Sequence, residues 1–276
     1  MASAGYSLVG FMDQEAAIAH LAYACIPPNP APEALEIEWN DAKAKIGAPM
    51  GAPGRPDIQP IPSEYDDYLA ELLAGPVGQN FEPQLTRDSF RLVEIDPLLA
   101  FQFTVDSVRS DHHCKSLNTS DISDLLTVAL PIHPLNDQYH VQMLPQSVII
   151  KSRSMNLRML SQGINANVAG IQFGFSVALV HVVRHNDRCY LHNGFHRAFG
   201  ARLAGATHIP CVFRDVSSYA EAGIRTDGGT FSAKLLESEN PPTVGHFVHS
   251  RAHPVTLRAS TRILHVSWAE YSLYDE

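Results

Sequence analysis

Apolar and polar positions follow the clearest pattern in the second half of the chain. Phe175–His185 carries apolar residues at both odd and even positions, which predicts a strand buried on both faces. His185–Arg188 has the composition of a hairpin turn, and Cys189–Leu191 then forms the returning strand. We therefore expect a β-hairpin in this segment.

A helix and another strand follow this hairpin. Asn193 has the chemistry of an N-cap, and the helix is predicted from about Gly194 to Ala204. Gly205 is placed to end it in the left-handed conformation. Cys211–Phe213 is the next strand, so the predicted order is strand, hairpin, strand, helix, strand.

Weaker patterns of the same kind predict the remaining elements. The stretch 107–119 is polar and is expected to be irregular. Helices are predicted over 13–24, 63–74, 121–130 and 154–162, and strands over 90–105, 139–150 and 255–268.

Proline is concentrated between Pro27 and Pro62. Proline has no amide hydrogen and disfavours helix at the residue before it, so this stretch cannot be one regular element throughout. We expect a long ordered arm or a flexible linker.

Composition limits the class of protein. The chain has 276 residues, of which 45% are hydrophobic, enough for a sizeable core. The formal charge of -9 argues against a dominant nucleic-acid-binding surface, although it leaves room for a local basic patch. Four scattered cysteines, no signal peptide and no spanning apolar run predict a cytoplasmic protein with reduced thiols and no membrane partner.

The segment Leu191–Arg197 carries the most chemistry. The first amides of a helix have no partner within the helix, and the helix dipole adds partial positive charge there. Gly194 allows close approach to the backbone, and Arg197 in the first turn can hold phosphate oxygens. The segment thus favours a phosphate, and the alternative is an ordinary capped helix with a surface arginine.

The surrounding stretch, Tyr190–Phe213, resembles the signature of the ParB-like N-terminal domains and sulfiredoxins. That signature is a strand, Gly-x-x-Arg opening a helix with small residues, a glycine, and Ile-Pro before a strand. Gly194 and Arg197 match its fixed points, and Gly205 and Ile209-Pro210 match its body. The resemblance implies an α+β fold with a core of a small mixed sheet and packed helices over 88–216. Residues 1–87 would be N-terminal helices and the proline-rich arm, and 217–276 a β-containing C-terminal extension.

Members of this family bind nucleotide phosphates. The resemblance implies a nucleoside triphosphate, ATP or CTP with magnesium, as the ligand, and NTP hydrolysis, phosphoryl transfer or nuclease activity as the reaction. Arg197 would neutralise phosphate charge, and His196 would contact phosphate or assist proton transfer. Asn193, Gly194 and Phe195 would provide backbone amides, and Gln102 would stand at the family's Gln-Pro-Arg element.

The sequence departs from the family's pattern at some points, and these departures argue against some of the family's functions. Phe195 replaces the reactive cysteine of sulfiredoxins, so sulfinic acid reduction is not expected. The sequence after Asp215 shows no convincing DNA-reading helix. Two alternatives stay open: a DNA-associated or partition-type adaptor without catalysis, and a degenerate scaffold in which Phe195 fills the phosphate cradle. Assembly into a homo-oligomer is also left open.

Three further clusters are weaker candidates. Asp111–Cys114 contains only metal-ligating residue types, but adjacent residues rarely face one ion, so a solvated loop is preferred and no metal site is predicted. Glu237–Asn240 offers carboxylates and an amide, and is also assigned to a solvated loop. His246, His249 and His253 are expected to be surface or partly buried residues, with one wall of a pocket as the alternative.

Overall fold

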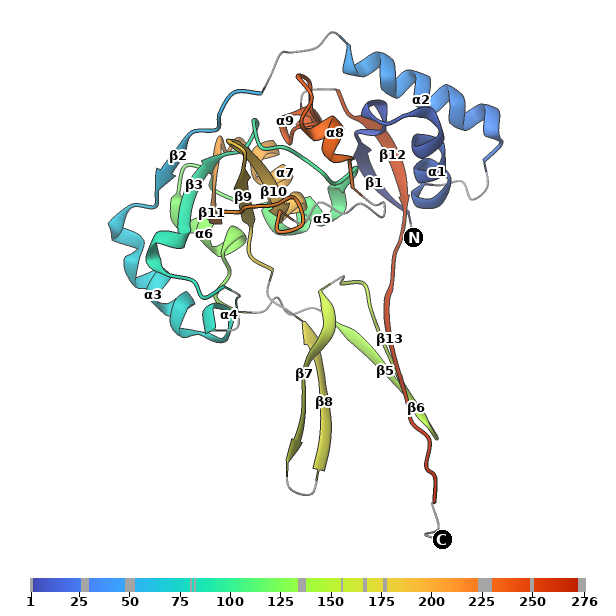
Figure 1. The fold of residues 1–276 in the computed structure, drawn as a ribbon, viewed down its shortest axis with the longest axis vertical. Helices are drawn as coiled ribbons and strands as arrows, with labels where there is room; N and C mark the ends of the chain where they lie inside the picture. The colour runs from blue at the N-terminus through green and yellow to red at the C-terminus, as the bar shows by residue number, and fades with distance from the viewer. Residues whose placement is uncertain are drawn as a thin grey trace. The chain divides into compact units, whose positions relative to one another are not determined.

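The chain is a mixed α+β protein that divides into two compact units (Figure 1). Unit 1 comprises Met1–Ile132 with Ala178–Arg258, and unit 2 comprises His133–Val177 with Ala259–Glu276. The predicted division at residues 88 and 216 derives from the resemblance and stays a prediction. The computed structural model describes residues 2–25, 30–47, 53–79, 81, 83–133, 138–154, 156–165, 168–175, 178–222, 230–248 and 251–272.

A mixed five-stranded sheet forms the centre of unit 1, with strand order β10-β9-β11-β3-β2. β11 runs parallel to β9 and antiparallel to β3, and β9 and β10 form a hairpin. The coarse prediction of an α+β fold with a small mixed sheet is therefore confirmed. The strands are β2 (Ile58–Pro60), β3 (Phe90–Glu94), β9 (His181–His185), β10 (Arg188–Asn193) and β11 (His208–Asp215).

The hairpin turn is confirmed, but the strand before it is shorter than predicted. Asn186 and Asp187 both have positive φ, 49° and 62°, the conformation of a turn whose twist matches the two strands. The first strand begins only at His181, whereas Phe175 ends a strand of unit 2. The apolar run 175–185 thus spans a change of unit, which periodicity cannot reveal.

The helix after the hairpin is α7 (Phe195–Leu203), and the predicted order of elements is confirmed. Gly205 has φ 106° and follows the helix in the left-handed conformation, as predicted. The predicted N-cap is wrong by one residue. Gly194, at φ 93°, occupies that position, and the Asn193 Oδ1 accepts a 2.8 Å hydrogen bond from the Gly194 amide.

Two helices capped by aspartates precede the hairpin in sequence. α6 (Ile122–Ala129) confirms the helix predicted there, and Asp121 accepts a hydrogen bond from the Ser123 amide. α5 (Ser107–Cys114) shows that the expectation of irregular chain over 107–119 is wrong. The polarity of this stretch reflects a partly exposed helix rather than a loop.

A second sheet of unit 1 joins the two ends of the sequence. Its strand order is β12-β1-β4, with β1 (Ala2–Ser7) between β4 (Thr104–Asp106) and β12 (His253–Arg258). α1 (Gln14–Ala24) confirms a predicted helix, and Asp13 accepts from the Ala16 amide at its start.

The proline-rich stretch contains a long helix, α2 (Pro32–Ile46), so the expected arm or linker is wrong for this part. Pro32 lies in the first turn, where a missing amide costs nothing. Leu35 and Ala42 are buried in one apolar cluster with α1, and the Trp39 indole donates to the Met12 carbonyl. Packing against α1 accounts for this helix.

Shorter elements complete unit 1. The helix predicted over 63–74 is confirmed as a 3₁₀ turn (Ser63–Tyr65) leading into α3 (Asp66–Ala74), in which Leu69 and Leu72 are buried. The others are α4 (Pro76–Gln79), α8 (Ala233–Leu236), α9 (Gly245–Val248) and 3₁₀ turns at Val9–Phe11 and Arg87–Ser89.

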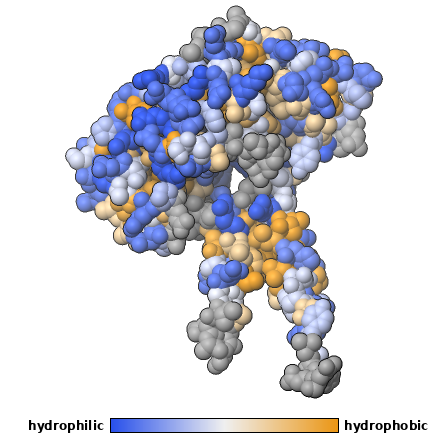
Figure 2. Space-filling view, in the orientation of Figure 1, coloured by the Kyte–Doolittle hydropathy of each residue, from blue (hydrophilic) through white to orange (hydrophobic). Residues whose placement is uncertain are grey.

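Unit 2 consists of strands. β5 (Tyr139–Leu144), β6 (Ser147–Ser152) and β13 (Arg262–Ser267) form one sheet, as the strand predictions for 139–150 and 255–268 indicate. β7 (Leu157–Asn165) pairs with β8 (Val168–Phe175), so the helix predicted over 154–162 is wrong. Apolar side chains such as Met143, Met159 and Ile171 are exposed, and Figure 2 shows orange surface over these strands.

All four cysteines are buried and unbonded to one another. Over the part of the chain that is described, the helices are too short or too polar for any of them to cross a membrane.

Candidate functional site

The start of α7 is fixed by Gly194. A Cβ atom at this position would lie 2.7 Å from the Val180 Cγ2, and its φ of 93° is unfavourable for other residues. The amides of Arg197 and Ala198 both donate to the Gly194 carbonyl, at 3.0 and 2.9 Å. The amides of Phe195 and His196 precede these bonds, so they lie at the positive end of the helix dipole without an intrahelical acceptor.

The Phe195 side chain is buried in the protein. It is 5% exposed and packs edge-on against Phe101, with 5.6 Å between ring centroids. Phe101 also contacts the ring of His192, which precedes the helix. The loop 100–103 therefore lies against the start of α7.

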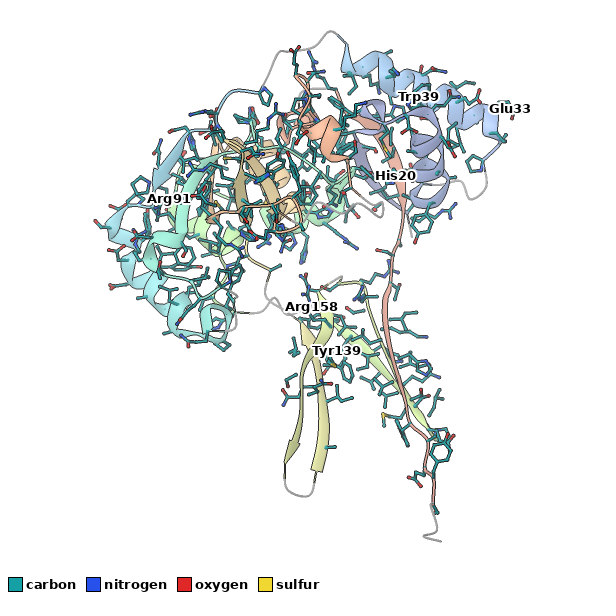
Figure 3. The ribbon with its side chains drawn as sticks, viewed as in Figure 1. His20, Glu33, Trp39, Arg91, Tyr139 and Arg158 are labelled. Carbon is teal, nitrogen blue, oxygen red and sulfur yellow. The ribbon has the colours of Figure 1, made fainter. Side chains whose placement is uncertain are left out.

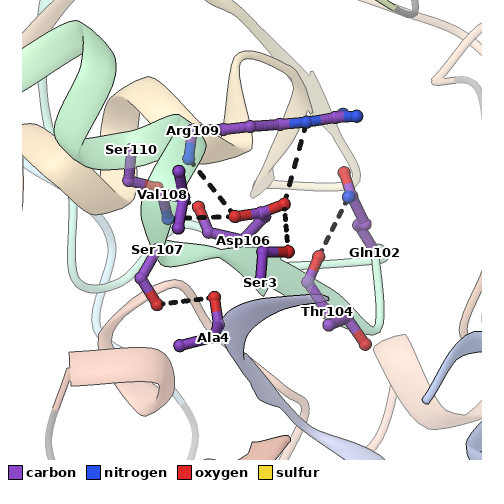
Figure 4. Close-up of polar contacts among 9 residues, drawn as sticks. All are labelled: Ser3, Ala4, Gln102, Thr104, Asp106, Ser107, Val108, Arg109 and Ser110. Atoms are coloured by element: carbon purple, nitrogen blue, oxygen red, sulfur yellow. Dashed lines mark hydrogen bonds and ion pairs between the residues drawn. The ribbon is translucent and has the colours of Figure 1, made fainter. Parts of the chain in front are cut away.

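This loop carries Gln102, which the resemblance places at the nucleotide. Its Nε2 donates to the Thr104 carbonyl at 3.0 Å, so the amide nitrogen is held within its own loop (Figure 4). Phe101 and Phe195 bring the Gln102 loop and the α7 start together, as the resemblance requires. Contact of Gln102 with a ligand stays a prediction.

Arg197 joins α7 to α6. Its side chain is buried, and Nη1 donates to the carbonyls of Val128 and Ala129 at 3.2 and 3.3 Å. Burial lowers the pKa of Arg197 to about 10, so the guanidinium keeps its charge at neutral pH. Within the described residues no carboxylate comes within ion-pair distance of it. The C-terminal end of the α6 dipole supplies the compensating negative potential, which gives Arg197 a structural role.

His196 is half-buried at the same end of α7. Burial and, to a smaller extent, the nearby positive charge of Arg109 together lower its pKa to about 4. The imidazole is therefore neutral at pH 7. It can donate or accept a hydrogen bond, but it brings no charge to an anion.

Arg109 and Asp106 adjoin this end of α7, and the sequence analysis missed both. The Arg109 Nε lies 3.8 Å from the Asp106 Oδ2, while Asp106 Oδ1 accepts from the amides of Val108 and Arg109 (Figure 4). Ser3 of β1 donates to the other carboxylate oxygen at 2.9 Å. Asp106 is the N-cap of α5, and an aspartate is one of the preferred residues at a helix start, a signal that was missed because the polar stretch was interpreted as a loop.

The site offers little for a magnesium ion. Asp106 is the acidic residue whose charge acts on His196, and both of its carboxylate oxygens already accept hydrogen bonds. No group of three or more His, Cys, Asp or Glu side chains suited to a metal is found among the described residues. Magnesium at nucleotides is usually held by one or two carboxylates together with the phosphates, so a magnesium ion bound with the nucleotide stays a prediction.

Of the other sequence candidates, Asp111–Cys114 adjoins α7, and Glu237 lies at the far end of β10. Asp111–Cys114 forms the end of α5, not a loop, and the Cys114 thiol turns onto the Arg197 carbonyl at 3.7 Å. Glu237 accepts from the Tyr219 hydroxyl, and Arg188 binds the carbonyls of Leu236, Glu237 and Ser238, at the opposite end of β10 from Asn193.

The C-terminal histidines are buried rather than at the surface. The His246 Nδ1 accepts from the Thr243 amide at 2.8 Å, and His253 pairs with Glu38 of α2. Their contacts are separate, so these two do not line one pocket wall. His249 lies outside the described residues.

The start of α7 therefore gathers helix amides, a neutral histidine and a nearby arginine, whereas the signature arginine is turned to α6. Comparisons of the chain with protein-family models, with curated proteins and with solved structures found no match.

Proposed function

We propose that this protein binds a nucleotide, with its phosphates at the N-terminus of α7. The observation that carries the proposal is the helix start itself. The Phe195 and His196 amides lie there without an intrahelical acceptor, and Gly194 adds no side chain over them. The Phe195 side chain is packed against Phe101, so it contributes its amide without covering the helix end.

Charge for the phosphates would come from α5 rather than from the signature arginine. Arg109 is partly exposed and acts electrostatically on His196, whereas Arg197 is occupied by the α6 carbonyls. An arginine fork suits phosphate oxygens. Neutral His196 would donate one hydrogen bond, and a bound phosphate would raise its pKa.

Hydrolysis or phosphoryl transfer is the activity that the resemblance implies. His196 is the residue at this site that is able to accept a proton at neutral pH, because burial keeps it unprotonated. We derive no step through magnesium, since the described residues contain no cluster of ligating side chains that would hold it on their own.

The test is calorimetric titration of the chain with ATP, CTP, GTP and ADP, with and without magnesium. We expect one nucleotide to bind and Arg109→Ala to weaken it by about tenfold or more, because a charge-assisted hydrogen bond is lost. His196→Ala should weaken it less. Arg55→Ala removes the same charge from an exposed ion pair and should leave affinity unchanged.

Turnover is measured on the same samples as phosphate release. Absence of binding by any of the four nucleotides, with the protein folded, would overturn the proposal and leave the DNA-associated adaptor and the degenerate scaffold as the alternatives. Equal weakening by Arg55→Ala and Arg109→Ala would place the nucleotide elsewhere.

A further inference from the structure

Unit 1 contains a cavity whose lining residues differ from those at the start of α7. It has a volume of about 1000 Å³ and lies between α1, the chain at Phe103 and α8. Small-molecule sites occupy about 300–1,000 Å³ and are mostly apolar with a few polar groups. This cavity has the size of such a site.

Aromatic rings form much of its wall. Phe231 contacts Phe103 and Phe11, with centroid distances of 4.8 and 6.4 Å, and Phe103 packs edge-on against His20 at 5.1 Å. α1 contributes small side chains to the lining, including those of Ala16 and Ala19. Flat apolar molecules pack well against rings arranged in this way.

A chain of hydrogen bonds fixes the proton on His20. The Ser7 hydroxyl donates to the Phe103 carbonyl at 3.2 Å, so the Ser7 oxygen must accept from the Thr104 hydroxyl, 3.1 Å away. The hydroxyl proton of Thr104 is therefore already donated to Ser7. The His20 Nε2, 2.9 Å from the Thr104 Oγ1, must therefore be the donor in that contact.

The other ring nitrogen of His20 is consequently a bare acceptor. No donor among the described residues reaches Nδ1, and this atom is not one of the buried unpaired nitrogens. Burial lowers the pKa of His20 to about 4, so Nδ1 keeps its lone pair at neutral pH. His20 projects from α1 in Figure 3 and lines the cavity.

The neighbouring polar groups of the lining are already engaged within the protein. Asp13 accepts from the Ala16 amide, and Ser232 accepts from the Leu235 amide. Ser238 donates to the Leu235 carbonyl at 2.7 Å. Lys234 is exposed and provides donors only. His20 thus places an unused nitrogen acceptor beside the aromatic wall of this cavity.

We propose that this cavity binds a small, uncharged, largely aromatic molecule whose hydroxyl or N–H group donates to the His20 Nδ1. The apolar rings supply burial, and the His20 acceptor favours ligands that carry a donor. The proposal does not depend on nucleotide binding at α7.

Three naphthalene probes test the ligand class by calorimetry or fluorescence. 2-Naphthol carries a donor, 2-methoxynaphthalene lacks one, and 2-naphthoate is an anion. We expect 2-naphthol to bind about tenfold more tightly than the methoxy compound, the effect of one hydrogen bond. His20→Phe keeps an aromatic ring and should abolish that difference.

Two tryptophan variants of α1 test whether the ligand binds in this cavity. Ala19 lines the cavity and Glu15 does not, and both are exposed, so each substitution is compatible with folding. Ala19→Trp should abolish 2-naphthol binding, and Glu15→Trp should leave it unchanged. No saturable binding of 2-naphthol, equal loss in both variants, or tighter binding of 2-naphthoate would each overturn the proposal.

Discussion

Arg197 illustrates how one residue can match a signature and still take a different role. Its position in the first turn of α7 agrees with a phosphate ligand, but its Nη1 binds the last carbonyls of α6. A buried charge is tolerated when dipoles of the opposite sign surround it, and a helix C-terminus provides these. The sequence identifies the residue, but not the helix end that it meets.

We predict that Arg197 contributes to stability. Arg197→Leu should lower the free energy of unfolding by about 1–3 kcal/mol, because the Val128 carbonyl loses its donor, whereas the Ala129 carbonyl keeps the Val180 amide. Arg197→Lys should lose less, since it keeps the charge. Urea denaturation followed by circular dichroism measures both.

Arg55→Leu is the matched control, because Arg55 is exposed and its ion pair with Asp187 is open to solvent. It should change stability by no more than about 0.5 kcal/mol. If the Arg197→Leu protein is as stable as the parent, Arg197 has no structural role, and it is again a candidate for binding the phosphate.

At the level of elements, the two ends of α7 differ in how much they depend on glycine. Gly194 and Gly205 both have positive φ, at 93° and 106°. A Cβ on Gly194 would meet Val180 atoms at 2.7 and 3.1 Å, whereas a Cβ on Gly205 would meet only the Thr119 Oγ1, at 3.6 Å. The first position combines strain with a clash, and the second has strain alone.

Alanine at these two positions should therefore have unequal effects. Gly205→Ala should destabilise by about 1–2 kcal/mol, the cost of a left-handed alanine. Gly194→Ala should cost about 1–3 kcal/mol more, because the packed Val180 must also move. Thermal and urea denaturation of the two variants measure the difference. Equal losses of stability would show that Val180 moves without a cost in free energy.

Elements were predictable where the signals are local. The Asn186-Asp187 turn, Gly205 and the aspartate caps of α1 and α6 use chemistry that lies within a few residues. α2 and β7 depend on partners elsewhere, since α2 packs on α1 and β7 pairs with β8. Intrinsic propensity is weak beside such contacts, so these two predictions were wrong.

For the whole molecule, three buried or partly buried histidines predict sensitivity to acid. Burial lowers the pKa of His20 and His196 to about 4 and that of His181 to about 3. In the unfolded chain each titrates near pH 6.5. The folded state therefore binds fewer protons, and stability is full above about pH 6.5 and falls as pH drops toward 4.

Urea midpoints at pH 7, 6 and 5 check this window, which lies above the titration of most carboxylates. The urea midpoint should fall steadily as the pH is lowered. His181→Phe should make this decline shallower, because it removes one of the three imidazoles that take up a proton on unfolding. A midpoint that is the same at pH 5 as at pH 7 would contradict the burial of these imidazoles.

The division into units could not be predicted from the sequence. β6 pairs with β13 through contacts such as Lys151 with Ile263, more than a hundred residues apart. An alternating pattern indicates a strand, but it does not name the strand that pairs with it. For the site, the start of α7 was predictable because its signals are contiguous, whereas Arg109 was missed because α5 was read as a loop.

The pairing of β1 with β12 has a consequence for the order in which the molecule assembles. Ala2 lies opposite Arg258, so β1 is synthesised more than two hundred residues before the strand that pairs with it. Until then β1 has only the short β4 beside it, and one of its edges stays open. Closing a loop of this length is slow. Until β12 has been synthesised, this open edge is able to pair with a strand of another molecule, and the sheet is completed only after residue 258 has been added.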